Sequence, residues 1–147
     1  MDLTNMSFDE KYDLAENPST PVDVLRKLAK DTYEAVRWTV ASNSNTPADV
    51  LQELAKDNSY TVRAIVADNP STPENVLRAL VKDKGWRIRT AVAENPKAPS
   101  NILVMLFEYE KNFRKPDSGV IQSLYYNKNL PTFAKRVIET LFGEMVK

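Results

Sequence analysis

Cysteine and histidine are both absent from this chain of 147 residues, and glycine occurs only three times. The lack of cysteine excludes disulfide bonds and thiolate metal sites. The lack of histidine removes the commonest general base and the commonest metal ligand. Apolar runs are short, and none approaches the length of about 18 residues that a membrane-spanning helix needs. We therefore expect no catalytic residues, no metal or other cofactor, and no membrane partner.

Charge is balanced over the whole chain, with 20 basic and 20 acidic residues. Locally, residues 1–15 carry a net charge of −3, whereas residues 68–93 and 127–147 each carry +2. This gradient is too weak to be read as a nucleic-acid footprint. The acidic first segment also lacks the basic and apolar parts of a signal peptide. We therefore expect a soluble cytoplasmic protein, bacterial in style.

The dominant feature is a block that occurs three times at a spacing of 26 residues, without insertion or deletion. The blocks begin at Glu16, Ser42 and Asp68, and looser copies begin at Glu94 and Asn127. Repetition at such a period is typical of solenoids, in which each unit buries its apolar face against its neighbours. We expect one α-solenoid domain over 1–147, with about five two-helix repeats. Its expected parts are an N-terminal cap (1–15), three regular repeats (16–41, 42–67 and 68–93), an extended repeat (94–126) and a C-terminal cap (127–147).

Each block predicts two helices. The candidate N-cap residues of the first helices, each followed by a proline, are Thr20, Thr46 and Thr72. Apolar residues at helical spacing then predict a first helix of about three turns. In the first block these residues are Val24, Leu25, Leu28 and Ala29. A shorter second helix, of α or 3₁₀ type, is expected over about 34–41. No segment alternates with period two, so the predicted fold class is all-α without β-strands.

Asparagine recurs four residues before a proline in every block. The residues concerned are Asn17, Asn43, Asn69, Asn95 and Asn127. Asparagine suits such places because its amide can satisfy backbone groups in a tight turn. We interpret this asparagine row as structural, with a ligand-binding role as the alternative.

A second row combines aspartate with arginine, always six residues apart. Its members are Asp31, Arg37, Asp57, Arg63, Asp83 and Arg89. In the fourth block the corresponding positions hold Tyr109 and Ile121, so both partners are lost together, which indicates that they belong to one interaction. We expect each pair to bridge the turn between the two helices of its own repeat by charge-assisted hydrogen bonds. A row of catalytic acids or of phosphate-binding arginines is the alternative.

Positions that vary between repeats are free to form a binding surface. On the outward side of the second helices, these positions hold Trp38, Tyr60, Trp86 and Arg87. Aromatic residues and arginine dominate the energetics of protein interfaces. We expect these four residues to bind a partner, and the alternative is that each ring packs over a neighbouring repeat.

The fourth block departs most from the pattern, through an insertion of six residues within the segment KNFRKPDSG. The inserted loop, at Arg114–Gly119, is a further candidate for partner contact. Apolar residues then recur along one face of a last helix. They are Phe133, Val137, Ile138, Leu141, Phe142 and Met145. A bulkier last repeat is expected in a solenoid, because it closes the apolar end of the stack.

The pattern NPxTPxxVLxxLAxD…VRxxVA resembles the leucine-rich repeat variant family, which is similar to HEAT repeats. The resemblance covers residues 16–103 well and 127–142 loosely. It implies a right-handed superhelix without strands, built from an α-helix and a short second helix per repeat. The period of the family is slightly shorter, which favours a fuller α-helix here. A member of the family carries an iron–sulfur cluster on a cysteine-rich segment; this chain has no such segment, so no cofactor is implied. The family has no common activity.

The leading functional prediction is a non-catalytic scaffold, expected to be a monomer, that binds a protein or peptide. The alternative is a nucleic-acid-binding or DNA repair protein, similar to the glycosylases built from HEAT-like repeats. Those enzymes use an exposed tryptophan with a carboxylate and an arginine. The residues that could imitate this set are Trp38, Lys82, Trp86 and Arg87. A subunit of a larger complex without independent activity is a third possibility.

Overall fold

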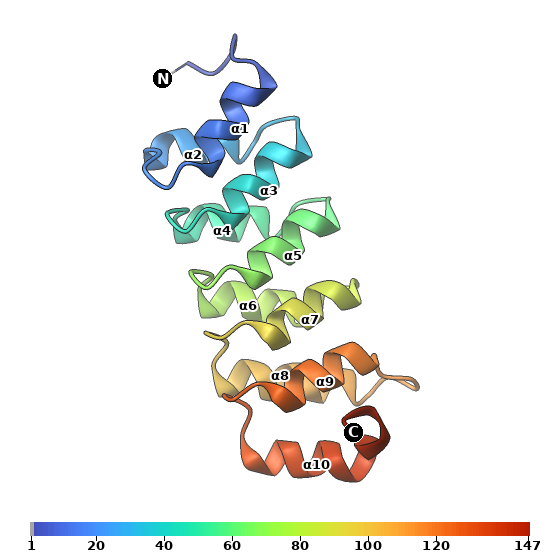
Figure 1. Cartoon of the computed structure of the whole chain (residues 1–147). Helices are drawn as coiled ribbons and strands as arrows, with labels where there is room; N and C mark the ends of the chain where they lie inside the picture. Colours follow the sequence, from blue (N-terminus) through green and yellow to red (C-terminus); the bar gives the residue numbers. More distant parts are fainter. Residues whose placement is uncertain (1) are drawn as a thin grey trace. The chain divides into compact units, whose positions relative to one another are not determined.

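The computed structural model describes residues 2–147, and over this range it contains helices and no strand (Figure 1). The elements are α1 (Phe8–Glu16), α2 (Val22–Leu28), α3 (Glu34–Ser42), α4 (Ala48–Leu54), α5 (Tyr60–Asp68), α6 (Glu74–Leu80), α7 (Trp86–Glu94), α8 (Ser100–Glu110), α9 (Ser118–Tyr126), α10 (Thr132–Phe142) and the 3₁₀ helix η1 (Gly143–Met145). The predicted all-α class is confirmed. None of the helices between residues 2 and 147 is long and apolar enough to cross a bilayer.

The chain divides into two compact units, one that ends at Pro73 and one that begins at Glu74. The first unit contains α1 to α5, and the second contains α6 to η1. Within the first unit the second helices of the repeats stack, α1 against α3 and α3 against α5. Within the second unit α7 stacks against α9 in the same way. This packing is that of helical repeats.

The two helices of a repeat differ from the prediction in their relative length. The first helices α2, α4 and α6 have seven residues each, while the second helices α3, α5 and α7 have nine and are α-helical. The prediction of a longer first helix is therefore wrong. Helix α2 ends early because Ala29 is followed by a turn in which Lys30 and Asp31 bond back to carbonyls of its last residues. The buried β-branched residues of α3 do not prevent a regular helix, since tertiary packing overrides weak propensity.

The threonine before each first helix acts differently from the predicted N-cap. Pro21 is the N-cap residue of α2, and no side chain caps that helix. Thr20 is buried, and its hydroxyl donates to the carbonyl of Leu14 in α1 at 2.6 Å. Thr46 and Thr72 donate in the same way to the carbonyls of the preceding second helices. Threonine suits this position because carbonyl groups in the last turn of a helix have few backbone donors, and a buried hydroxyl supplies one more.

The predicted apolar stripes form the core of each unit. Val24, Leu25 and Leu28 of α2 are buried, as are Val36 and Val40 of α3. The equivalent valines and leucines of α4 and α5 in the first unit are buried as well, and so are those of α6 in the second. Each such leucine contributes about 1.5–3 kcal/mol by leaving water.

Asparagine side chains connect successive repeats. The Nδ2 group of Asn43 donates to the carbonyls of Ala15 (2.8 Å) and Asn17 (3.0 Å), which end the preceding second helix. Its Oδ1 atom accepts from the backbone N–H of Asn45. Asn69 and Asn127 make the same bonds in their own units: each amide donates to two carbonyls at the end of the preceding second helix and accepts from a backbone N–H two residues later. The turn-forming role was predicted, whereas the connection to the preceding repeat was not.

Helix α10 buries only part of its apolar face. Ala134 and Ile138 are buried against the rest of the second unit. Phe133, Val137 and Leu141 are exposed, although the sequence predicted that they would help to close the end of the stack. The face therefore splits along the helix into a buried side and an exposed side.

Candidate functional site

Aspartates and arginines six residues apart form one row along the repeats, which we call the Asp–Arg row. Each arginine of this row was predicted to pair with the aspartate of its own repeat. Instead, Arg37 forms a bidentate ion pair with Asp57 of the next repeat, with Nε–Oδ2 and Nη2–Oδ1 distances of 2.7 and 3.1 Å. Within its own repeat, Arg37 donates to the backbone carbonyls of Asp31 (2.9 Å) and Thr32 (3.2 Å). The predicted pairing with the Asp31 carboxylate is wrong, because the guanidinium lies between the turns of two neighbouring repeats.

The row also continues at both ends, beyond the residues that the sequence predicted. The Asp31 carboxylate pairs with Lys11 of α1 at 2.9 Å. Lys11 lies 26 residues before Arg37, so α1 is a degenerate second helix in which lysine replaces arginine. In the second unit, Arg89 pairs with Glu110, whose side chain is fully buried. The inference that both partners are lost in the fourth block is therefore wrong. The carboxylate belongs to Glu110, one residue after Tyr109, so an alignment of the repeats at a strict spacing of 26 residues does not find it.

The remaining contacts of the row are also structural. Arg63 is buried and donates to the carbonyls of Asp57 (2.8 Å) and Asn58 (3.2 Å). Arg89 donates to the carbonyl of Asp83 at 2.9 Å, and the Asp83 carboxylate accepts from the N–H of Gly85. The charged groups of the row thus bond to one another and to the backbone. This geometry supports the structural interpretation over a row of catalytic acids.

Asp57 makes part of the stability of the first unit dependent on pH. Its side chain is only 9% exposed, and this burial raises its pKa, but the hydrogen bonds from Arg37 and from the Ser59 backbone together lower the pKa below its usual range. A carboxyl group whose pKa is lowered by folding stabilises the protein above its unfolded pKa of about 4, and this contribution is lost as the pH falls.

Asp57→Asn is therefore expected to lower the free energy of unfolding by about 1.5–3 kcal/mol at pH 7, the contribution typical of hydrogen bonds to charged groups. The asparagine keeps an oxygen to accept from Ser59, so the loss is specific to the Arg37 pair. Urea unfolding at several pH values measures it. The difference between wild type and variant should shrink as the pH falls below about 4, and a constant difference would contradict the assignment.

The aromatic residues predicted to bind a partner lie in different environments. Tyr60, the first residue of α5, is 57% exposed, and Trp86, the first residue of α7, is 46% exposed. Arg87 is exposed beside Trp86, with its guanidinium carbon 5.1 Å from the ring centroid. Trp38 is only half-exposed, and its ring packs edge-on against Tyr12 of α1 at 6.0 Å. Trp38 therefore helps to hold α1 against α3.

Two exposed aromatic residues of the first unit were missed. Tyr33, which precedes α3, is exposed and lies edge-on to Phe8, the first residue of α1, at 5.2 Å. Phe8 could have been found, since it lies 52 residues before Tyr60 at the same position of the repeat. Exposed rings thus occur at the starts of α1, α3 and α5. We call these three residues of the first unit, Phe8, Tyr33 and Tyr60, the aromatic row.

A shallow depression adjoins the aromatic row. It has a volume of about 440 Å³ and is lined by Thr32, Glu34, Arg37, Asn58, Ser59 and Tyr60. The Ser59 hydroxyl donates to the Glu34 carboxylate at 2.6 Å across it. The depression therefore offers an aromatic ring together with hydrogen-bonding groups held on the starts of two helices.

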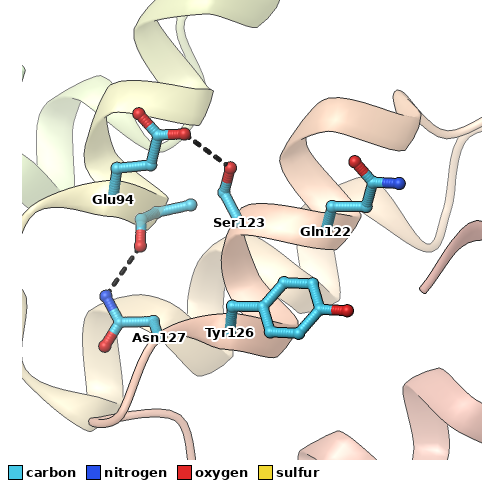
Figure 2. A pocket seen from close by; sticks show the side chains of 6 residues that line it. Glu94, Gln122, Ser123, Tyr126 and Asn127 are labelled. Carbon is cyan, nitrogen blue, oxygen red and sulfur yellow. Dashed lines mark hydrogen bonds between the residues drawn. The ribbon is translucent and has the colours of Figure 1, made fainter. Parts of the chain in front are cut away.

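A second depression, of about 380 Å³, lies in the second unit at the ends of α7 and α9 (Figure 2). Its lining residues are Ala93, Glu94, Gln122, Ser123, Tyr126 and Asn127. Figure 2 shows the Ser123 hydroxyl directed at the Glu94 carboxylate, to which it donates at 2.9 Å. Asn127 is turned instead to the backbone carbonyl of Ala93, at 2.7 Å. The sequence did not predict this depression, whose polar groups largely bond within the protein.

No group of three or more carboxylates between residues 2 and 147 is arranged to hold a metal ion. The site that the geometry presents is thus a set of exposed aromatic side chains on packed helices. Comparison of the chain with models of known protein families, with curated proteins and with solved structures finds no match.

Proposed function

We propose that this chain is a non-catalytic repeat scaffold that binds a protein or peptide through the starts of its second helices. The proposal includes a right-handed α-solenoid of the leucine-rich repeat variant kind, a cytoplasmic setting and no cofactor. The observation that carries the proposed binding role is the exposure of Tyr60 and Trp86 at equivalent positions of two repeats. A large exposed ring is costly in water and is enriched at binding sites.

The scaffold supports this role because its own bonds involve other residues. The ion pairs of the Asp–Arg row and the amides of the asparagine row lie between repeats and hold the helices in place. Rings on such rigid helices lose little conformational entropy when a partner binds. The depression beside Tyr60 adds hydrogen-bonding groups that can orient the main chain of a peptide.

Peptides selected from an unbiased library against the whole chain test the proposal. Tyr60→Ala and Trp86→Ala are each expected to weaken the selected peptides of their unit by about tenfold or more, as for interface hot spots. Thermal unfolding of both variants should remain close to that of wild type, because the rings are exposed. The proposal fails if peptides that bind the wild type bind the double variant equally well.

Trp38→Ala is the matched control. It removes the same kind of side chain from the outward side of a second helix, but the ring is packed on Tyr12. We expect it to lower stability by about 1–3 kcal/mol through lost packing. Peptides that bind at the starts of the helices should retain their affinity for the folded variant.

A further inference from the structure

The second unit combines exposed aromatic rings with exposed cations in one place. Phe113, in the connection between α8 and α9, is 41% exposed and adds to Trp86. The cations around these rings are Lys84, Arg87, Arg114 and Lys115, all exposed. We call these six residues the basic aromatic patch.

Contacts within the second unit bring together the two segments that form the patch, residues 84–87 and residues 113–115. The guanidinium carbon of Arg89 in α7 lies 5.5 Å from the ring centroid of Phe113, so the α8–α9 connection lies against α7. Trp86 is close to the start of α9, since its Cζ3 atom would be 4.0 Å from a Cβ atom at Gly119. In Figure 1 the α8–α9 connection extends beyond the helices on the side where α7 starts.

The patch keeps a net positive charge, because its four exposed cations outnumber the three nearby carboxylates, one of which is paired with Arg89. Glu110 is buried and paired with Arg89. Asp117 caps α9 and accepts from the N–H groups of Gly119 (2.9 Å) and Val120 (3.2 Å). The Asp83 carboxylate accepts from the N–H of Gly85 in the turn before α7. These acids hold the local backbone and Arg89, while the cations of the patch face solvent.

We propose that the basic aromatic patch binds an acidic peptide segment that presents an apolar or aromatic residue between carboxylates. The inference rests on the proposed function and names the partner chemistry of the second unit. Guanidinium groups pair with carboxylates in a planar, two-bond geometry that Arg87 and Arg114 can offer. The exposed parts of Trp86 and Phe113 supply the apolar contact.

Two observations favour a peptide over single-stranded nucleic acid. Stacking of bases requires open ring faces, but Arg87 covers one face of Trp86 and Arg89 lies over Phe113. Binding to a polyphosphate chain also needs an extended cationic path, whereas the whole chain carries no net charge. A short acidic segment needs only the few cations that the patch provides.

The experiment measures binding of fluorescent peptides to the whole chain by anisotropy. The probe has a central Leu-Phe pair between runs of glutamate, and the matched probe has glutamine in place of glutamate. We expect the glutamate peptide to bind at least about tenfold more tightly than the glutamine peptide, and less tightly as salt is added. Equal affinities for the two peptides, or no binding of the glutamate peptide, would overturn the proposal.

Two charge-reversed variants localise the site. Arg114→Glu/Lys115→Glu changes exposed residues of the patch, and Lys30→Glu/Lys56→Glu makes the same change of net charge in the first unit. Only the former should lose binding of the glutamate peptide, by about tenfold or more. Equal losses would show that binding follows overall charge, and the patch would then be excluded.

A single strand of oligothymidine serves as the competitor. If it binds more tightly than the glutamate peptide and depends on the same residues, the patch is a nucleic-acid site and the proposal is wrong. Failure of the two proposals is distinguishable, because neutral library peptides that depend on Tyr60 would uphold the scaffold function while the acidic peptide fails at the patch.

Discussion

Arg89→Ala is expected to lower the free energy of unfolding by about 3–5 kcal/mol, because it leaves a buried carboxylate without its cation. Glu110 has no exposed surface, and Arg89 also supplies the hydrogen bond to the carbonyl of Asp83. Removal of the arginine takes the donor from the Asp83 carbonyl and leaves the buried carboxylate of Glu110 with no cation, only the N–H of Asp117 at 3.4 Å. Equilibrium unfolding in urea, followed by circular dichroism, measures the loss.

A double replacement separates the pair from its surroundings. Arg89→Met/Glu110→Leu removes both charges and keeps the volume, so it should be far less destabilising than Arg89→Ala, as for other buried pairs replaced by apolar residues. Arg37→Ala in the first unit is the matched single change. Its pair is partly exposed, so a smaller loss is expected. Additive effects of Arg89→Ala and Glu110→Ala would show that the two residues are not coupled.

Asn43→Ala is the second change with a large expected effect, a loss of about 2–4 kcal/mol. The buried amide donates to the carbonyls of Ala15 and Asn17 and accepts from the N–H of Asn45. Each buried polar group left without a partner costs about 1–3 kcal/mol. Asn17→Ala is the matched control, because Asn17 is exposed and accepts from the N–H of Ser19 in the same kind of turn. Its loss should stay below about 1 kcal/mol.

Asn43→Asp distinguishes the loss of these hydrogen bonds from a simple packing defect, because only the former predicts a stability that depends on pH. The aspartate keeps the acceptor for Asn45 but places a carboxylate against the carbonyls of Ala15 and Asn17, which repel it. Folding should therefore raise the pKa of this new carboxyl group. A group with a raised pKa destabilises the fold when it ionises, so the variant should recover stability relative to wild type as the pH falls. A pH-independent loss would contradict the assigned hydrogen bonds.

The helical class was predictable because the apolar stripe recurs with the repeat. The partner of Arg37 was not, and the regularity of the repeat is the reason. Arg37 and Arg63 each have one aspartate six residues before them and another 20 residues after them, so both spacings recur. Periodicity therefore cannot distinguish a bond within a repeat from a bond to the next. Only the packing of Arg37 between two turns selects Asp57.

The candidate site was predictable only where exposure follows from position in the repeat. Tyr60 and Trp86 begin their helices, and both are exposed as expected. Trp38 was misjudged because the side chain that covers it, Tyr12, lies outside the regular repeats. The basic aromatic patch was not predictable for a similar reason, because Phe113 lies in the segment that contains the insertion, which no other repeat has.

The side-chain bonds of Arg37 and Asn43 connect neighbouring repeats, and this determines how the first unit unfolds. Arg37 reaches forward to the next repeat, and Asn43 reaches back to the preceding one. An isolated repeat would contain neither bond, so its intrinsic stability is low and the energy lies in nearest-neighbour coupling. When coupling exceeds intrinsic stability, a partly melted array is less stable than either end state. Neighbouring repeats of this unit are therefore expected to melt cooperatively.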